Sequence, residues 1–219
     1  MVATEAVRRV AVGPVARVLP AAEAGAAATE PDLARVERGV REILAGLGED
    51  PDREGLADTP ARVARAFSEL LAGTRERAED HLARVFSQDH AGDDIVMLKG
   101  IRFVSLCEHH LLPFTGIAHV AYLPSHGRVT GLSKLARTVD VFARRLQMQE
   151  RLTTQVADAL VEHLDPRGVA VVVESEHSCL RLRGARKEDA FMVTTAFRGA
   201  LEHDRALRAE VLSLMGIGR

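Results

Sequence analysis

The chain has 219 residues and a net charge of −2, with 47% hydrophobic and 27% charged residues. This balance is typical of an ordinary globular protein, and the near-neutral charge argues against nucleic acid or an anionic membrane as a partner. The two cysteines are too few for a disulfide framework, and no apolar run approaches the roughly 20 residues of a membrane helix. We therefore expect a cytoplasmic protein with no membrane contact.

The chain divides into three predicted parts. Residues 1–30 are an alanine-rich, poorly ordered leader, in which Pro14 and Arg17 interrupt the apolar run that a secretory signal needs. Residues 31–92 are predicted to form an N-terminal helical region. Residues 93–219 mix strand and helix patterns and form the main domain.

Helix signals dominate the second part. Asp32 is a predicted N-cap before apolar residues at helical spacing, and Gly48 ends that helix. A second helix is expected to open at Thr59-Pro60, and a short third one to cover His81 to Phe86.

The pattern of the main domain predicts two strands, two helices, two further strands and a last helix. This order favours an α+β fold over an alternating parallel sheet. Lys134 to Leu164 is strongly helical, and periodicity alone also allows one continuous helix there, because no residue breaks the pattern. The expected strands cover residues 95–98 with 101–104, 117–123, 169–173 and 191–197, and the last helix covers 206–215.

The densest chemistry lies in two short runs, Cys107–His110 and His177–Cys179. A thiolate and an imidazole three residues apart can bind one metal ion from a single turn, and Zn²⁺ accepts both ligand types. A set of Cys107, His110 and Cys179 leaves the fourth zinc position open, which is typical of a catalytic site rather than a structural one. His109 and His177 then flank the metal and suit proton transfer near neutral pH.

A structural reading competes with this one. A lone cysteine is most often a small buried apolar residue, and a lone histidine a hydrogen-bonded one. Both cysteines of this chain lie beside histidines, and this coincidence favours the metal.

A second group of candidates is charged. Ser133 and Lys134 open a predicted helix and Arg137 follows one turn later, which together form a candidate phosphate site. Arg183 follows closely after Cys179. On helices such basic side chains are more often solvated. Glu150 is either a helix-start carboxylate or an acceptor for the N–H edge of a guanine.

Four linked motifs resemble the GTP cyclohydrolase I family in order and spacing. They are Cys107-Glu-His-His-Leu-Leu-Pro-Phe, Gly131-Leu-Ser-Lys, Gln147-Met-Gln-Glu-Arg-Leu, and His177-Ser-Cys with Arg183-Gly184. The similarity runs from about Asp32 to Gly199 and includes Thr59-Pro60-Ala61-Arg62. None of the motifs is specific alone, but their combination is.

The resemblance implies a tunnelling fold (T-fold) of antiparallel hairpins and helices, assembled as a toroidal homodecamer with active sites at subunit interfaces. It also implies that GTP is hydrolysed and rearranged to 7,8-dihydroneopterin triphosphate with release of formate, the first step of tetrahydrofolate and pterin biosynthesis. It leaves room for allosteric control of the ring.

The resemblance also assigns roles to individual residues. Zn²⁺, held by Cys107, His110 and Cys179, activates water to attack C8 of guanine. The catalytic residues are His109, His177 and Ser133, the last of which assists the sugar rearrangement. The substrate-binding residues are Glu150 and Gln149 at the guanine, and Lys134, Arg137, Arg183 and a neighbouring subunit's Arg62 at the triphosphate.

Leu146 departs from the family, whose members usually have proline at this position. The family proline indicates that two helices meet here, in contrast to the continuous helix that periodicity allows. Two other functions remain open: a paralogue that makes the same product for a 7-deazapurine or other specialised pathway, and a non-catalytic zinc-binding ring protein. A nitrile reductase of the same fold is disfavoured, because it has no need of the Cys-Glu-His-His cluster.

Overall fold

A computed structural model describes residues 29–87 and 94–217. The expected leader therefore lies outside the described residues apart from its last two positions, and the expected boundary at 92/93 falls in the undescribed stretch between the two ranges.

The α-helices are α1 (Leu33–Gly46), α2 (Thr59–Leu70), α3 (Ala78–Leu82), α4 (Leu132–Ala143), α5 (Gln149–Leu164), α6 (Ser178–Arg181), α7 (Ala200–His203) and α8 (Arg205–Met215), with a 3-10 helix η1 (Ala72–Arg75). The strands are β1 (Val85–Ser87), β2 (Val96–Cys107), β3 (Pro113–Leu123), β4 (Arg128–Thr130), β5 (Leu146–Gln147), β6 (Gly168–His177) and β7 (Met192–Gly199).

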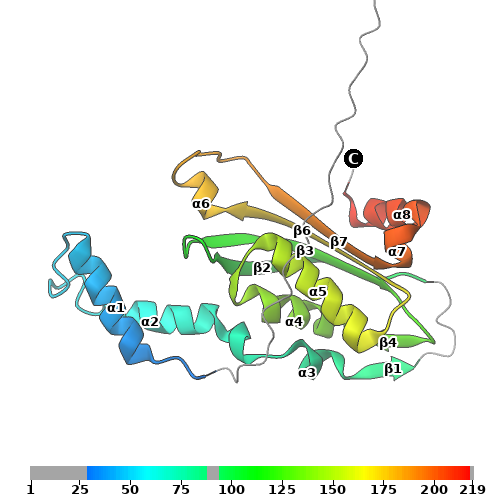
Figure 1. The fold of residues 1–219 in the computed structure, drawn as a ribbon, viewed down its shortest axis with the longest axis horizontal. Coiled ribbons are helices and arrows are strands. Elements are labelled where there is room, and N and C mark those ends of the chain that lie inside the picture. The colour runs from blue at the N-terminus through cyan, green and yellow to red at the C-terminus, as the bar shows by residue number, and fades with distance from the viewer. Residues whose placement is uncertain (1–28, 88–93, 218–219) are drawn as a thin grey trace, which may run out of the picture.

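The first two helices begin where their caps predict. The Asp32 side chain accepts a hydrogen bond from Arg35 N at 2.9 Å and so satisfies one of the free amides at the start of α1. Pro60 lies in the first turn of α2, where its missing N–H costs nothing. These two helices pack on each other, and Figure 1 shows them extending away from the sheet.

The main sheet has five strands in the order β5-β2-β3-β6-β7. Strands β2, β3, β6 and β7 pair antiparallel in long hairpins, and β5 adds a short parallel pair to the end of β2. A bulge interrupts β2 between Leu98 and Ile101, where Gly100 has a φ of 74° that other residues rarely adopt. A separate two-stranded sheet joins β1 to β4.

Helices cover the two faces of the main sheet unequally. One face packs against α4 and α5, with Leu135, Leu152 and Leu160 fully buried. The other face packs against α7 and α8 at one end only, around Val172 and Leu201; Figure 1 shows these helices on the opposite side of the sheet from α4 and α5. This arrangement of antiparallel hairpins and helices confirms the expected α+β fold.

Several boundaries differ from the sequence-based expectation. The helix expected over His81 to Phe86 lies earlier, as α3, and residues 85–87 form β1 instead because they pair with β4. Strand β6 extends to His177, well past the apolar run, because β3 pairs with it along its whole length and β7 pairs with it as far as Ser175. No helix in the described ranges has the length and apolar character needed to cross a bilayer.

The continuous helix that periodicity allows over Lys134 to Leu164 does not form, and the break that the family proline indicates is present. Helix α4 ends at Ala143, and α5 begins only at Gln149. The Arg145 guanidinium holds this connection in place, since it donates to the carbonyl oxygens of Gly73, Val141 and Glu76 at 2.9–3.0 Å. Leu146 therefore lies in β5, three residues before the helix.

We predict that Leu146→Pro leaves the protein as stable as before or raises its stability by about 0.4–1 kcal/mol through a stiffer unfolded chain. Glu108 N donates to Gln147 O at 3.0 Å, so Gln147 faces β2. Because N–H groups alternate in direction along a strand, the Leu146 N–H points to the outer side of this edge strand, where proline is tolerated. Thermal unfolding of Leu146→Pro beside Leu146→Ala, which removes the leucine side chain alone, measures the effect. A melting temperature several degrees below that of Leu146→Ala would contradict the prediction.

Candidate metal centre and active site

Cys107 is the last residue of β2 and begins a tight loop. Its N–H donates to Leu112 O at 2.9 Å, and its carbonyl oxygen accepts from His110 N and Leu111 N at 3.3 and 2.8 Å. Leu111 closes the loop with a left-handed φ of 54°. These bonds fold the chain back, so that the His110 ring lies beside the Cys107 thiol.

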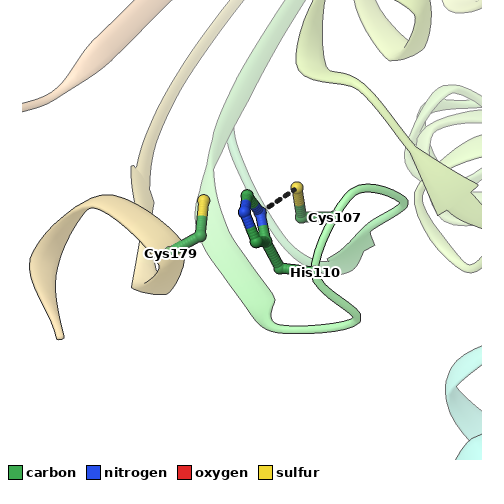
Figure 2. A group of neighbouring side chains, drawn as sticks. All are labelled: Cys107, His110 and Cys179. Atoms are coloured by element: carbon green, nitrogen blue, oxygen red, sulfur yellow. Dashed lines mark hydrogen bonds between the residues drawn. The ribbon is translucent and has the colours of Figure 1, made fainter. Parts of the chain in front are cut away.

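Cys179 reaches the same place from another part of the chain. Since β3 runs antiparallel to both β2 and β6, these two strands run in the same direction and finish at the same end of the sheet. Cys179 follows β6 in the short helix α6. Figure 2 shows the His110 ring between the two thiols, which come from separate segments.

The predicted metal ligands are brought together. The ligand atoms of Cys107, His110 and Cys179 lie within 4.8 Å of one another, and Cys107 Sγ is 4.0 Å from His110 Nδ1. Ligands of a tetrahedral zinc ion are about 3.5–3.8 Å apart, given Zn–S and Zn–N lengths of about 2.3 and 2.0 Å. The group therefore fits zinc if its atoms, which lie within 4.8 Å of one another, move together by up to about 1 Å, and two thiols with one imidazole are donors that zinc prefers.

The electrostatics of the two thiols agree with this fit. Burial raises the pKa of Cys179, and the neighbouring Cys107 raises it further, while the Arg183 charge acts in the opposite direction. The Cys107 thiol thus disfavours ionisation of Cys179, and a bound divalent cation reverses that preference.

His177 is the last residue of β6 and is held from two sides. Its ring stacks on the buried Phe114 ring with a centroid distance of 4.5 Å and an angle of 5° between the planes. Its Nε2 lies 2.9 Å from Gln149 Oε1. Burial lowers the pKa of His177, and the negative charge of Glu150 partly offsets this effect.

His109 and Glu150 are more open. His109 is exposed and its Nδ1 lies 3.9 Å from Cys107 Sγ. Glu150 lies exposed in the first turn of α5, and its electrostatic effect on His177 places it in the same site. The structure thus brings both histidines and this carboxylate to the end of the sheet where the ligand group lies.

Gln149 lies differently from what the sequence suggests. Its side chain is fully buried, with 0% exposure, and it contacts His177 and strands β6 and β7 rather than the open site. The family resemblance placed it beside Glu150 at the guanine, whereas its side chain points into the protein.

Two residues that support the site were not predicted from the sequence. The Arg151 side chain forms a short ion pair with Glu108, which ties the loop of the ligand group to the first turn of α5. Phe114 supports the His177 ring. Both lie within the quoted motifs, but nothing in the linear sequence shows that they meet their partners.

The basic residues separate into two groups. Arg183 acts electrostatically on Cys179 and belongs to the same end of the sheet. The start of α4, with Ser133, Lys134 and Arg137, follows Thr130, whose N–H donates to the Tyr122 hydroxyl at 3.0 Å. Tyr122 pairs with Val96, at the far end of β2 from Cys107. A single chain therefore does not bring this helix start to the ligand group.

Arg62 also lies apart from this group. It is exposed on α2, where its side chain pairs with Asp58 at 2.9 Å. Within the part of the chain that the structure describes, no recorded contact links Arg62 to the ligand group or to the histidines beside it.

Comparisons with known proteins identify the family of the chain. The family model described as GTP cyclohydrolase I matches residues 36–216. The chain is 57% identical over 198 residues to GTP cyclohydrolase 1 of Thermobifida fusca (90% of this chain, 94% of the relative), and 54% identical over 184 residues to GTP cyclohydrolase 1 of Bacillus cytotoxicus (84% and 96%). A solved structure of an archaeosine synthase QueF-Like in the apo form is 21% identical, with a TM-score of 0.42, over 50% of this chain and 97% of that one. On the family match and these close relatives, the chain belongs to the GTP cyclohydrolase I family, a family of hydrolases.

Proposed function

We propose that this chain hydrolyses and rearranges GTP to 7,8-dihydroneopterin triphosphate with release of formate, in a zinc-dependent reaction that begins tetrahydrofolate and pterin biosynthesis. The observation that carries the proposal is the convergence of Cys107, His110 and Cys179 at the end of the sheet that also holds His177. The relatives named GTP cyclohydrolase 1 support GTP as the substrate.

The reaction removes C8 of guanine, which requires hydrolysis of both C–N bonds to that carbon. Zinc held by Cys107, His110 and Cys179 would supply a Lewis acid that makes water nucleophilic near neutral pH. His177 and His109 move protons between water and the guanine nitrogens as the ring opens. The burial that lowers the pKa of His177 keeps its imidazole neutral, and so able to accept a proton, over a wider pH range.

The remaining residues bind and orient the substrate. Glu150 accepts hydrogen bonds from the N–H edge of guanine, because its carboxylate is exposed next to His177. Arg183, Lys134 and Arg137 bind the triphosphate, with Arg62 from a neighbouring subunit. Ser133 assists the rearrangement of the ribose.

The grouping of His109, His177 and Glu150 favours an enzyme over a non-catalytic zinc-binding ring protein. Such a protein has no use for proton-transfer groups beside its metal. Two thiols that serve as metal ligands must stay reduced, which supports a reducing compartment such as the cytoplasm.

The separation of the site residues supports an active site between subunits. Lys134 and Cys107 lie near opposite ends of β2, and a strand of this length spans on the order of 35 Å, too far for one nucleotide to bridge. The described part of β2 before Leu106 pairs only with β3, and the described part of β7 pairs only with β6. Two open sheet edges are a ready means of pairing with further copies, as the proposed toroidal homodecamer requires.

The first test is direct. Purified protein incubated with GTP and zinc should release formate and yield a pterin that fluoresces after oxidation. We expect about one zinc per subunit by elemental analysis, and Cys107→Ala or Cys179→Ala should lose both the metal and turnover, because two remaining ligands hold zinc weakly. Full turnover in a rigorously metal-free preparation would rule out the zinc-dependent reaction.

Glu150→Gln tests recognition of guanine. It keeps the size of the side chain but loses the charge, so kcat/KM for GTP should fall about a hundredfold, given about 2–3 kcal/mol for a charged hydrogen bond. Glu162→Gln is the matched control, since Glu162 is an exposed carboxylate later in the same helix. If both variants keep wild-type kinetics, Glu150 is only a helix-start residue.

Mixing inactive variants tests the shared site. Cys107→Ala and Lys134→Ala should each be inactive alone, yet chains dissociated and reassembled together should recover about a quarter of wild-type activity. Random pairing gives each interface site both wild-type residues in about one case in four. Light scattering on the wild-type protein should show a large ring. No recovery on mixing, or an active monomer, would show that one chain builds the whole site.

A further inference from the structure

The side chain of Gln149 is buried, and both of its polar atoms are used inside the protein. Its oxygen lies 2.6 Å from Ser175 Oγ and 2.9 Å from His177 Nε2. Its nitrogen donates to Val173 O, Met192 O and Thr194 Oγ1 at 2.9–3.1 Å. We propose that Gln149 is a positioning residue that holds His177 in the tautomer protonated at Nε2, so that Nδ1 is the nitrogen that moves protons. This inference rests on the proposed function of His177.

The contacts of the amide fix which end is oxygen. An amide nitrogen can only donate and an amide oxygen can only accept. Two of the three groups at the nitrogen end are backbone carbonyl oxygens, which also only accept. A flipped amide would place its oxygen against both carbonyls, so the oxygen must face His177.

The proton on His177 follows from that orientation. Since Gln149 Oε1 can only accept, His177 Nε2 must carry the hydrogen, and a neutral ring then has its lone pair on Nδ1. The buried side-chain polar atoms without a partner, in the residues that the structure describes, are Ser105 Oγ, His119 Nδ1 and Gln147 Oε1. His177 Nδ1 is not among them and has no recorded hydrogen bond, so it is open to the site.

The ring cannot exchange its two nitrogens easily. Phe114 is 99% buried and covers one face of the imidazole, and a turned ring would leave Gln149 Oε1 against a carbon. During turnover Nδ1 takes up a proton and later releases it from the same atom, while Nε2 keeps its own proton, hydrogen-bonded to Gln149 Oε1. His177 therefore returns to its starting tautomer after each cycle.

The anchor of the amide is itself rigid. Thr153 Oγ1 donates to Gln149 O at 2.8 Å and lies 2.6 Å from Thr194 Oγ1, so α5 and β7 are joined beside the amide. Glutamate at position 149 has no donor for the two carbonyls, and asparagine is one methylene too short. The chemistry of these contacts thus selects glutamine for the position, without any contact to substrate.

The tautomer can be read directly. Solid-state ¹⁵N NMR of the zinc-loaded protein, labelled at its nine histidines, distinguishes a protonated from an unprotonated ring nitrogen, and His177→Gln identifies the His177 signals by their loss. At mildly alkaline pH we expect a neutral ring with the proton on Nε2. A neutral ring protonated at Nδ1 would overturn the proposal, and this result depends on neither turnover nor the folding of any Gln149 variant.

Kinetics separate positioning from substrate binding. Gln149→Met keeps the length of the side chain and removes its hydrogen bonds, so kcat should fall about a hundredfold, the scale of a general acid–base contribution, with KM for GTP changed less than threefold. The His177 signals should show a mixture of tautomers. Gln155→Met is the matched control: Gln155 lies in the same helix, is hydrogen-bonded to Gln147, and should keep wild-type kcat.

A third variant separates the two bonds to the amide oxygen. Ser175→Ala removes one of them and leaves the His177 bond in place, so the tautomer should stay unmixed. A rise in KM with unchanged kcat in Gln149→Met would show a substrate-binding role and overturn the positioning role. If the wild-type protein does not convert GTP, the proposed function fails, while the ¹⁵N spectrum still decides the tautomer.

Discussion

The antiparallel pairing of β3 with both of its neighbours determines where the site lies. Because β2 and β6 consequently finish at the same end of the sheet, two short runs that are far apart in sequence meet there. The register is equally important: Phe114 lies opposite His177 on one side and opposite Ser105 on the other. A slip of one residue in either pairing would move alternate side chains to the other face and separate Cys107 from Cys179.

Some buried polar side chains at this end of the sheet have hydrogen-bond partners for all of their polar atoms, and others do not. Every polar atom of the Gln149 side chain has a partner, and a fully satisfied buried network is rigid. By contrast, Ser105 Oγ in β2 and Gln147 Oε1 in β5 are buried without one. Each such atom costs about 1–3 kcal/mol. These costs lie in β2, which ends at Cys107, and in β5, which pairs with that end of β2, whereas the contacts that orient His177 are complete.

The sequence predicted what depends on neighbours along the chain. Three features were predicted in this way: the caps of α1 and α2, the α+β class, and the spacing of Cys107 and His110. Each is visible in the pattern of neighbouring residues along the chain. The length of β6 was underestimated because Glu174 and Glu176, which alternate onto the open face, ended its apolar run. The position of Gln149 could not be predicted, because its partners in β6 and β7 are set by the pairing of those strands and not by the residues beside it in sequence.

The same strand geometry limits what one chain can do. It joins the two cysteines and His177 at one end of the sheet and leaves Lys134 near the other, after a loop that Tyr122 anchors. If Lys134 and the ligand group bind one nucleotide, that nucleotide must lie between two copies of the chain. The triphosphate contacts then depend on an interface, whereas the ligand group depends only on the fold of one chain. Conditions that weaken the interface should then remove triphosphate binding before they disturb the zinc site. In that arrangement, binding of substrate and association of the copies are coupled, since a ligand that contacts two subunits stabilises the contact between them.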